Sequence, residues 1–361
     1  MIERTTEHRA PLQAVFLLPV KDNIMAQRAK GAVTIMSEPG TPHILIVGAA
    51  TELGLEAVRQ LSARGQRISG IAASDKEAAQ IHDAGGTAQR ANPSDSASLT
   101  SAVAATAPSV IINLTPQSAN SLLHDGHAWK GFDTVLRDGT TALLEAAKSA
   151  HTPFVIHASY AFLYGSKLNA VEDDRLQPPS DHPAFAAALA AEQKFVESGI
   201  AHSILRLGFL YGQQSHALVQ YKRSFDLHRA YYAGVPGNVS SMLHSSDAAR
   251  ALALVAERQP QGETFNVADD APVWFGDFID TFAHDVGKKN APPHIPPRFV
   301  RLAGFAIKRP QVDILNLSTA VNSAKMHQQL DWSPEYPTYH EGLRAAAAAL
   351  FPQAQRVAAT R

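Results

Sequence analysis

The sequence predicts an α/β protein built on a doubly wound parallel sheet. Three observations lead to this fold class. A short apolar run at 43–47 passes through a glycine turn into a stretch with helical spacing, as a buried parallel strand does. Strand-like and helix-like segments then alternate as far as residue 159, which favours right-handed crossovers. At 361 residues the chain is long enough for one large α/β domain, or for a domain with a smaller lobe.

The first strand, turn and helix form the motif on which the other elements depend. Such a unit directs free backbone N–H groups and the positive end of the helix dipole at one point, where a pyrophosphate can bind. Gly48 permits the turn, and Gly54 allows the helix to pack closely on the strand. The usual three-glycine fingerprint has a glycine where this chain has Thr51, which narrows the room for a phosphate. An ordinary strand-to-helix turn is the alternative interpretation.

The remaining elements follow from the same patterns. Capping residues at 92–95 predict a helix that starts near Ser96. Strands are expected at 67–73, 87–90, 109–116 and 153–159, and helices at 76–84, 134–150, 251–258, 275–286 and 341–351. Ligands of such a sheet bind at the carboxyl ends of its strands.

The end of the second strand bears on the choice of a nucleotide. In dinucleotide sites an acidic residue there selects the ribose 2′-hydroxyl, and a basic residue selects the 2′-phosphate. Here the strand ends in Ala73 and Ser74, and Asp75 and Lys76 follow. The choice between NAD and NADP therefore stays open.

The composition excludes several functional classes. Hydrophobic residues make up 45% of the chain and charged residues 18%, and the formal net charge is −1. We therefore expect neither nucleic acid nor a membrane as a partner, because no basic surplus and no long apolar stretch is present. The absence of cysteine fits a cytoplasmic protein. The 16 histidines show no zinc-ligand spacing, so we predict no metal.

Composition also divides the chain. Residues 1–40 carry no sustained period and are expected to be a disordered extension, with Met36 as an alternative start. We assign 41–212 to the nucleotide-binding domain, to which some later segments return, and most of 213–352 to a C-terminal lobe. Residues 353–361 are expected to fray.

Several motifs, taken in order, carry a resemblance to a known family. They are Val47-Gly-Ala-Ala-Thr-Glu-Leu-Gly54, Val110-Ile-Ile-Asn-Leu-Thr115, Ala158-Ser-Tyr-Ala-Phe-Leu-Tyr-Gly165, Ile204-Leu-Arg-Leu-Gly-Phe-Leu-Tyr-Gly212, His244-Ser-Ser-Asp247 and Leu330-Asp-Trp-Ser-Pro334. From about 43 to 350 the chain resembles the extended short-chain dehydrogenase/reductases, also called the NAD-dependent epimerase/dehydratase family. The resemblance implies a Rossmann-type sheet that binds NAD(P) and a smaller C-terminal substrate lobe that closes over a small molecule.

The resemblance also implies cofactor-binding positions in this chain. The pyrophosphate would be bound by the first turn, the adenosine ribose by the end of the second strand, the adenine near the third strand and the nicotinamide ribose by the end of the fourth. The corresponding residues are Gly48, Thr51, Glu52, Leu53 and Gly54 for the pyrophosphate, Ser74 for the ribose, Asn92 for the adenine, and Leu114, Thr115 and Pro116 for the nicotinamide ribose.

The chemistry departs from the family pattern. The family's mechanism resembles general acid catalysis by a tyrosine whose pKa is lowered by a lysine four residues later, and none of the eight tyrosines has a lysine at that spacing. The expected positions are Ala184 and Ala188. Ser159 and Tyr160 are the nearest substitutes. For Tyr160 the simpler interpretation is an aromatic ring that fills the space left by the two alanines.

Two main functional hypotheses remain, besides a third in which Thr51 abolishes cofactor binding altogether. The first is an NAD(P)-dependent oxidoreductase or epimerase/dehydratase that acts on a small carbonyl or sugar-like substrate with a non-standard acid or base. The second is a catalytically silent relative that retains the nucleotide fold as a sensor or assembly subunit. By analogy with the family, a homodimer formed through two helices is expected.

Overall fold

A seven-stranded parallel sheet forms the centre of the structure, which is a computed structural model. The structure describes residues 42–116, 131–178, 183–228, 232–233, 237–288, 294–295, 313–314 and 316–352. The strand order is β12-β7-β5-β4-β1-β2-β3, so the order reverses between β1 and β4. The bounds are β1 His43–Val47, β2 Arg67–Ala72, β3 Thr87–Arg90, β4 Val110–Asn113, β5 Phe154–Tyr160, β7 His202–Leu207 and β12 Glu263–Val267. The predicted doubly wound sheet is confirmed.

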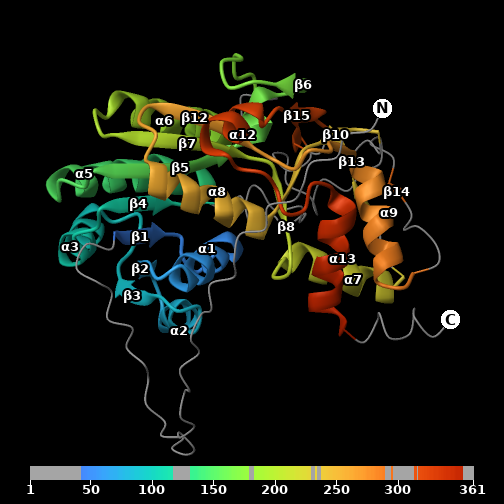
Figure 1. The fold of residues 1–361 in the computed structure, drawn as a ribbon, viewed down its shortest axis with the longest axis horizontal. Coiled ribbons are helices and arrows are strands. Elements are labelled where there is room, and N and C mark those ends of the chain that lie inside the picture. Colours follow the sequence, from blue (N-terminus) through green and yellow to red (C-terminus); the bar gives the residue numbers. More distant parts are fainter. Residues whose placement is uncertain are drawn as a thin grey trace, which may run out of the picture. The chain divides into compact units, whose positions relative to one another are not determined.

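Helices cover both faces of this sheet, and β1 shows why. Its side chains point alternately to the two faces, as in any strand. Ile44 and Ile46 belong to one apolar cluster, and Leu45 and Val47 belong to another. The first cluster packs under α1 (Glu52–Ala63) and α8 (Ser245–Arg258), and the second under α3 (Ser96–Thr106) and α5 (Thr140–Ser149) (Figure 1). A strand buried on both faces is apolar throughout, which explains the uninterrupted apolar sequence of β1.

Beyond the carboxyl ends of the strands, an aromatic-rich core supports smaller elements. Two helices, α9 (Phe275–Asp285) and α13 (Tyr339–Leu350), pack side by side there, with α7 (His216–Asp226) nearby (Figure 1). A four-stranded sheet has the order β13-β10-β15-β6, and β8 pairs with β11. The bounds are β6 Lys167–Ala170, β8 Phe209–Tyr211, β10 Val239–Ser240, β11 Met242–His244, β13 Val273–Trp274 and β15 Thr319–Val321; α2 is Asp75–Asp83, α6 is Pro183–Glu197, α12 is Ala324–Leu330, and β9 and β14 are Tyr232–Ala233 and His294–Ile295.

The structure corrects the bounds of three expected elements. The helix expected at 251–258 is α8 and begins earlier, at Ser245, with His244 as its N-cap. The strand expected at 109–116 ends at Asn113, because the Asn113 side chain accepts hydrogen bonds from the Thr115 backbone and hydroxyl and turns the chain. The helix expected at 134–150 begins with a short α-helical turn, α4 (Phe132–Thr134), followed by a π-helical turn at Val135–Gly139. Within the described ranges, no helix is both long enough and apolar enough to cross a membrane. The expected extension at 1–40, Met36 and the expected frayed tail at 353–361 lie outside these ranges.

Candidate cofactor and active site

Two glycines shape the turn between β1 and α1. Gly48 has a φ of +87°, and a Cβ there would lie 3.0 Å from the Thr115 methyl group and 3.1 Å from the Leu114 carbonyl. A Cβ on Gly54 would overlap the carbonyl oxygen of Gly48. The turn and its contact with the end of β4 therefore require glycine at both positions.

Thr51, at the middle position of the glycine motif, is the N-cap of α1. Its hydroxyl donates to the Gly48 carbonyl at 2.7 Å and accepts from the Gly54 N–H at 3.0 Å. These two hydrogen bonds of the Thr51 side chain fix the backbone of the turn and cap the helix, which explains how the turn forms without a glycine at the middle position.

The turn opens onto a cavity of about 480 Å³. Four of the residues predicted to bind the cofactor line this cavity, and they come from three segments that are far apart in sequence. These four are Gly48, Thr51, Ser74 and Thr115; the other lining residues are Ala50, Ile71, Ala73, Lys76, Glu77, Gln80 and Pro93. The cavity therefore lies where the strand order reverses, at the carboxyl ends of β1, β2 and β4, as ligand sites in such sheets do.

The other predicted cofactor residues stand behind or beside this cavity. Leu53 and Leu114 are buried in the apolar core, with 1% and 0% of their surface exposed. The Asn92 side chain accepts from the Ser94 N–H at 3.0 Å, and the neighbouring Pro93 lines the cavity instead. The Glu52 carboxylate accepts from the His216 N–H at 2.6 Å, which ties the first turn of α1 to the start of α7.

The positions expected for the catalytic tyrosine and lysine are apolar. Ala184 and Ala188 lie on α6, are 2% and 1% exposed, and belong to the same apolar cluster as Tyr160. Tyr160 is fully buried, and its ring stacks on Phe162 with 5.0 Å between centroids. Its hydroxyl donates to the backbone carbonyl of Pro116, and burial raises the pKa of this phenol far above its ordinary value. Tyr160 therefore stays neutral at ordinary pH.

Ser159 is also committed to a structural contact. Its hydroxyl donates to Glu192 of α6, and the Arg206 guanidinium donates to the same carboxylate, with Nη2 2.8 Å from Oε2. Arg206 also donates to the Tyr164 hydroxyl at 2.7 Å. Sequence reasoning missed Glu192, although it lies one helical turn after Ala188 on the same face. The network joins β5, α6 and β7 under the expected substrate side of the site.

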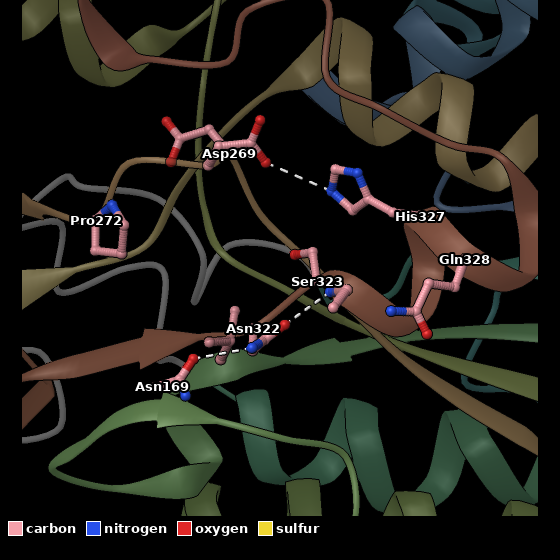
Figure 2. A pocket seen from close by; sticks show the side chains of 10 residues that line it. Asn169, Asp269, Pro272, Asn322, Ser323, His327 and Gln328 are labelled. Carbon is pink, nitrogen blue, oxygen red and sulfur yellow. Dashed lines mark hydrogen bonds and ion pairs between the residues drawn. The ribbon is translucent and has the colours of Figure 1, made fainter.

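A second cavity, of about 400 Å³, shares no lining residue with the first. Asn169 and Asn322 lie side by side at one edge, with 2.9 Å between the amide nitrogen of Asn322 and the side-chain oxygen of Asn169, and His327 lies toward the other (Figure 2). Burial raises the pKa of Asp269 to about 9, so this carboxyl is neutral at ordinary pH. The described residues contain no group of three or more histidine and acidic side chains that could hold a metal.

The family model for the NAD dependent epimerase/dehydratase family matches residues 44–268, most of the described sheet. The chain belongs to this family. This result confirms the predicted resemblance, and with it the expectation of NAD(P) as the cofactor.

The individual relatives share less than a third of their aligned residues with this chain. A 3-diazoavenalumate denitrifying reductase from a Streptomyces species is 28% identical over 319 residues, which cover 83% of this chain and 99% of the relative. A 4-hydroxy-2-methyl-3-oxo-4-farnesyl-3,4-dihydroquinoline-1-oxide ketoreductase from Stigmatella aurantiaca is 25% identical over 57% of this chain and 68% of its own. Both are named as reductases, so the silent alternative receives no support from them.

Solved structures show the same fold. The NAD complex of dTDP-glucose 4,6-dehydratase from Bacillus anthracis superimposes with a TM-score of 0.71 at 18% identity, covering 87% of this chain and 97% of that chain. UDP-glucose 4-epimerase from Thermotoga maritima, with UDP-glucose, also gives 0.71 at 17% identity, covering 85% and 98%. At these identities the likeness establishes the predicted fold class and nothing about the substrate.

Proposed function

We propose that the protein is an NAD(P)-dependent reductase of a small molecule. The observation that carries this proposal is the cavity at the turn between β1 and α1, which gathers Gly48, Thr51, Ser74 and Thr115 from separate segments. When bound, NAD(P)H supplies the hydride. The names of two relatives as reductases support the direction of transfer.

The residues of the chain have binding roles in this scheme. The first turn of α1 presents backbone N–H groups, which suit the pyrophosphate, and Gly48 allows it to come close to the backbone. Ser74 lines the cavity and would contact the adenosine ribose, and Thr115, just after β4, would contact the nicotinamide half. Pro116 is held in place by the Tyr160 hydroxyl.

The lack of a side chain that is free to donate a proton restricts the class of substrate that the protein can reduce. Ala184 and Ala188 have no group that transfers a proton, and Ser159 and Tyr160 already donate to protein acceptors. Reduction of a carbonyl leaves an alkoxide, which needs an acid. An aryl diazonium ion would need no acid: a hydride supplied by the cofactor would replace dinitrogen, which would depart with the C–N electron pair and leave a neutral arene and the oxidised cofactor. We therefore propose an electrophile of this kind, in line with the diazo relative.

A small carbonyl or sugar-like substrate is the second candidate, favoured by the ketoreductase relative. This candidate requires the Tyr160 hydroxyl to leave Pro116 and protonate the substrate as a neutral phenol, since burial opposes its ionisation. The two candidates therefore make opposite predictions for Tyr160→Phe.

The first test is titration of the purified protein with NADH and with NADPH. Binding is measured by nicotinamide fluorescence and by the shift in melting temperature. Saturable binding of at least one cofactor is expected. Oxidation of the bound reduced cofactor is then followed with a panel of ketones, sugar nucleotides and aryl diazo compounds. If neither NADH nor NADPH binds, the proposed function is wrong.

Two further proposals concern the setting of the protein. We propose a cytoplasmic location, supported by the absence of cysteine. We also propose a homodimer formed through two helices, by analogy with the family. Light scattering of the purified full chain tests the second proposal, and a monomer across micromolar concentrations would contradict it.

A further inference from the structure

In dinucleotide sites the end of the second strand selects between NADH and NADPH. In the proposed cofactor cavity, the one beside the turn between β1 and α1, this position is the end of β2. The last residue of β2 and the one after it, Ala72 and Ala73, have no charged side chain. Ser74 follows as the N-cap of α2 and lines the cavity. The strand end therefore lacks the acidic residue that would accept a hydrogen bond from a ribose 2′-hydroxyl.

Glu77 is the acidic residue of the cavity wall, but its carboxylate already has a partner. Its Oε2 accepts from the Ala73 N–H at 2.7 Å, and the Ser74 Oγ accepts from the Glu77 N–H at 3.2 Å. These two bonds cap the start of α2 in the manner of a capping box, except that the carboxylate accepts from the residue before the N-cap. Glu77 therefore has a structural role that accounts for its position.

Lys76 is the cation of the same wall. It is exposed and lines the cavity, and in the described part of the chain it forms neither a hydrogen bond nor an ion pair. Its neighbour Asp75 pairs instead with Arg90, which lies opposite Ala72 on β3, at 3.4 Å. The positive charge of Lys76 is thus available to a ligand, while the acidic groups beside it are engaged.

From this arrangement we propose that the cofactor is NADP(H), and that Lys76 and Ser74 recognise its 2′-phosphate. The ammonium group supplies the charge, and the Ser74 hydroxyl, which accepts from Glu77, still has its proton to donate. The inference rests on the proposed function, because it presupposes that the cavity binds a nicotinamide cofactor. It makes Lys76 a determinant of cofactor specificity.

The test compares dissociation constants for NADPH and NADH in the full-length protein, Lys76→Ala and Lys148→Ala. Lys148 is an exposed lysine on α5 outside the cavity, so its variant removes the same charge elsewhere. We expect the unaltered protein to bind NADPH at least about tenfold more tightly than NADH. Lys76→Ala should remove most of that preference by weakening NADPH binding alone, and Lys148→Ala should preserve it.

Three results would overturn the inference: tighter binding of NADH by the unaltered protein, an equal loss for both cofactors in Lys76→Ala, or an unchanged ratio in Lys76→Ala. The first would mean that the end of β2 favours a ribose 2′-hydroxyl over a 2′-phosphate. Failure of both cofactors to bind is a separate outcome, since it removes the proposed function as well. Circular dichroism of each variant establishes that the fold is intact, as expected for exposed side chains.

Discussion

The hydroxyl of Tyr160 donates to the backbone carbonyl of Pro116, and so joins the end of β5 to the segment after β4. Tyr160 also packs in the cluster that contains Ala184 and Ala188. The ring thus packs in the same apolar cluster as the two positions at which the family pattern expects a tyrosine and a lysine, and its hydroxyl holds the Pro116 carbonyl. This geometry favours a positioning role over proton transfer.

Tyr160→Phe tests that role. Loss of one buried hydrogen bond should lower the free energy of unfolding by about 1 kcal/mol, because the Pro116 carbonyl loses its donor. We expect kcat for the preferred diazo-type substrate to stay within about threefold, since no proton from Tyr160 is used. General acid catalysis is typically worth about 10²-fold or more, so a loss of that size with a ketone substrate would instead establish Tyr160 as the acid. Steady-state kinetics and urea unfolding provide the two measurements.

The glycines of the first turn give a second prediction. Gly48→Ala and Gly54→Ala should each weaken cofactor binding by about tenfold or more, equivalent to about 1.4 kcal/mol. The cause is steric, because the added Cβ of Gly48 meets Thr115 and Leu114, and that of Gly54 meets Gly48 itself.

Gly65→Ala is the matched control for this pair. Gly65 has a φ of +77°, close to that of Gly48, but a Cβ there has no neighbour within 4 Å. This variant should lose about 1 kcal/mol of stability through backbone strain and keep its cofactor affinity. If all three variants bind the cofactor as tightly as the unaltered protein, the turn does not contact the cofactor.

Much of the fold and part of the candidate site could be predicted from the sequence, for identifiable reasons. The order of strands and helices was predictable because buried parallel strands such as β1 are apolar throughout. Gly48 and Gly54 were predictable because no other residue allows such close approach. Conversely, Glu192 and the direction of the Ser159 hydroxyl depend on how α6 packs against β5 and β7, which local sequence does not specify. Lys76 was visible, but its lack of a partner depends on the pairing of Asp75 with Arg90.

The Glu192–Arg206 pair gives a third prediction. Both side chains are less than 10% exposed, so removing one leaves the other charge buried without its partner. Arg206→Leu or Glu192→Leu alone should lower the free energy of unfolding by about 3–5 kcal/mol. The double variant should be more stable than either single variant, because no uncompensated charge remains. Chemical unfolding of all four proteins measures the coupling, and simple additivity would contradict it.

The last prediction concerns the pH dependence of stability, to which buried histidines and a buried carboxyl contribute in opposite directions. Burial lowers the pKa of His157 and of His244 to about 4, from 6.5. Their neutral forms stabilise the fold above pH 6.5, and this contribution is lost as pH falls toward 4, because unfolding then takes up a proton at each histidine. Asp269 behaves in the opposite way, since burial raises its pKa to about 9 from 3.8. Its contribution is complete below pH 3.8 and declines as pH rises toward 9.

For these three groups, unfolding takes up one net proton between about pH 4 and 6.5, and releases one between about 6.5 and 9. Their summed contribution therefore peaks near pH 6.5 and falls by about 1.4 kcal/mol per pH unit on either side. Asp269→Asn removes the titrating carboxyl, so its stability relative to the unaltered protein should rise steadily between pH 5 and 9, approximately at that slope. Urea unfolding at intervals of pH measures this difference. A constant difference would mean that Asp269 is ionised in the native protein and that an internal partner compensates its charge.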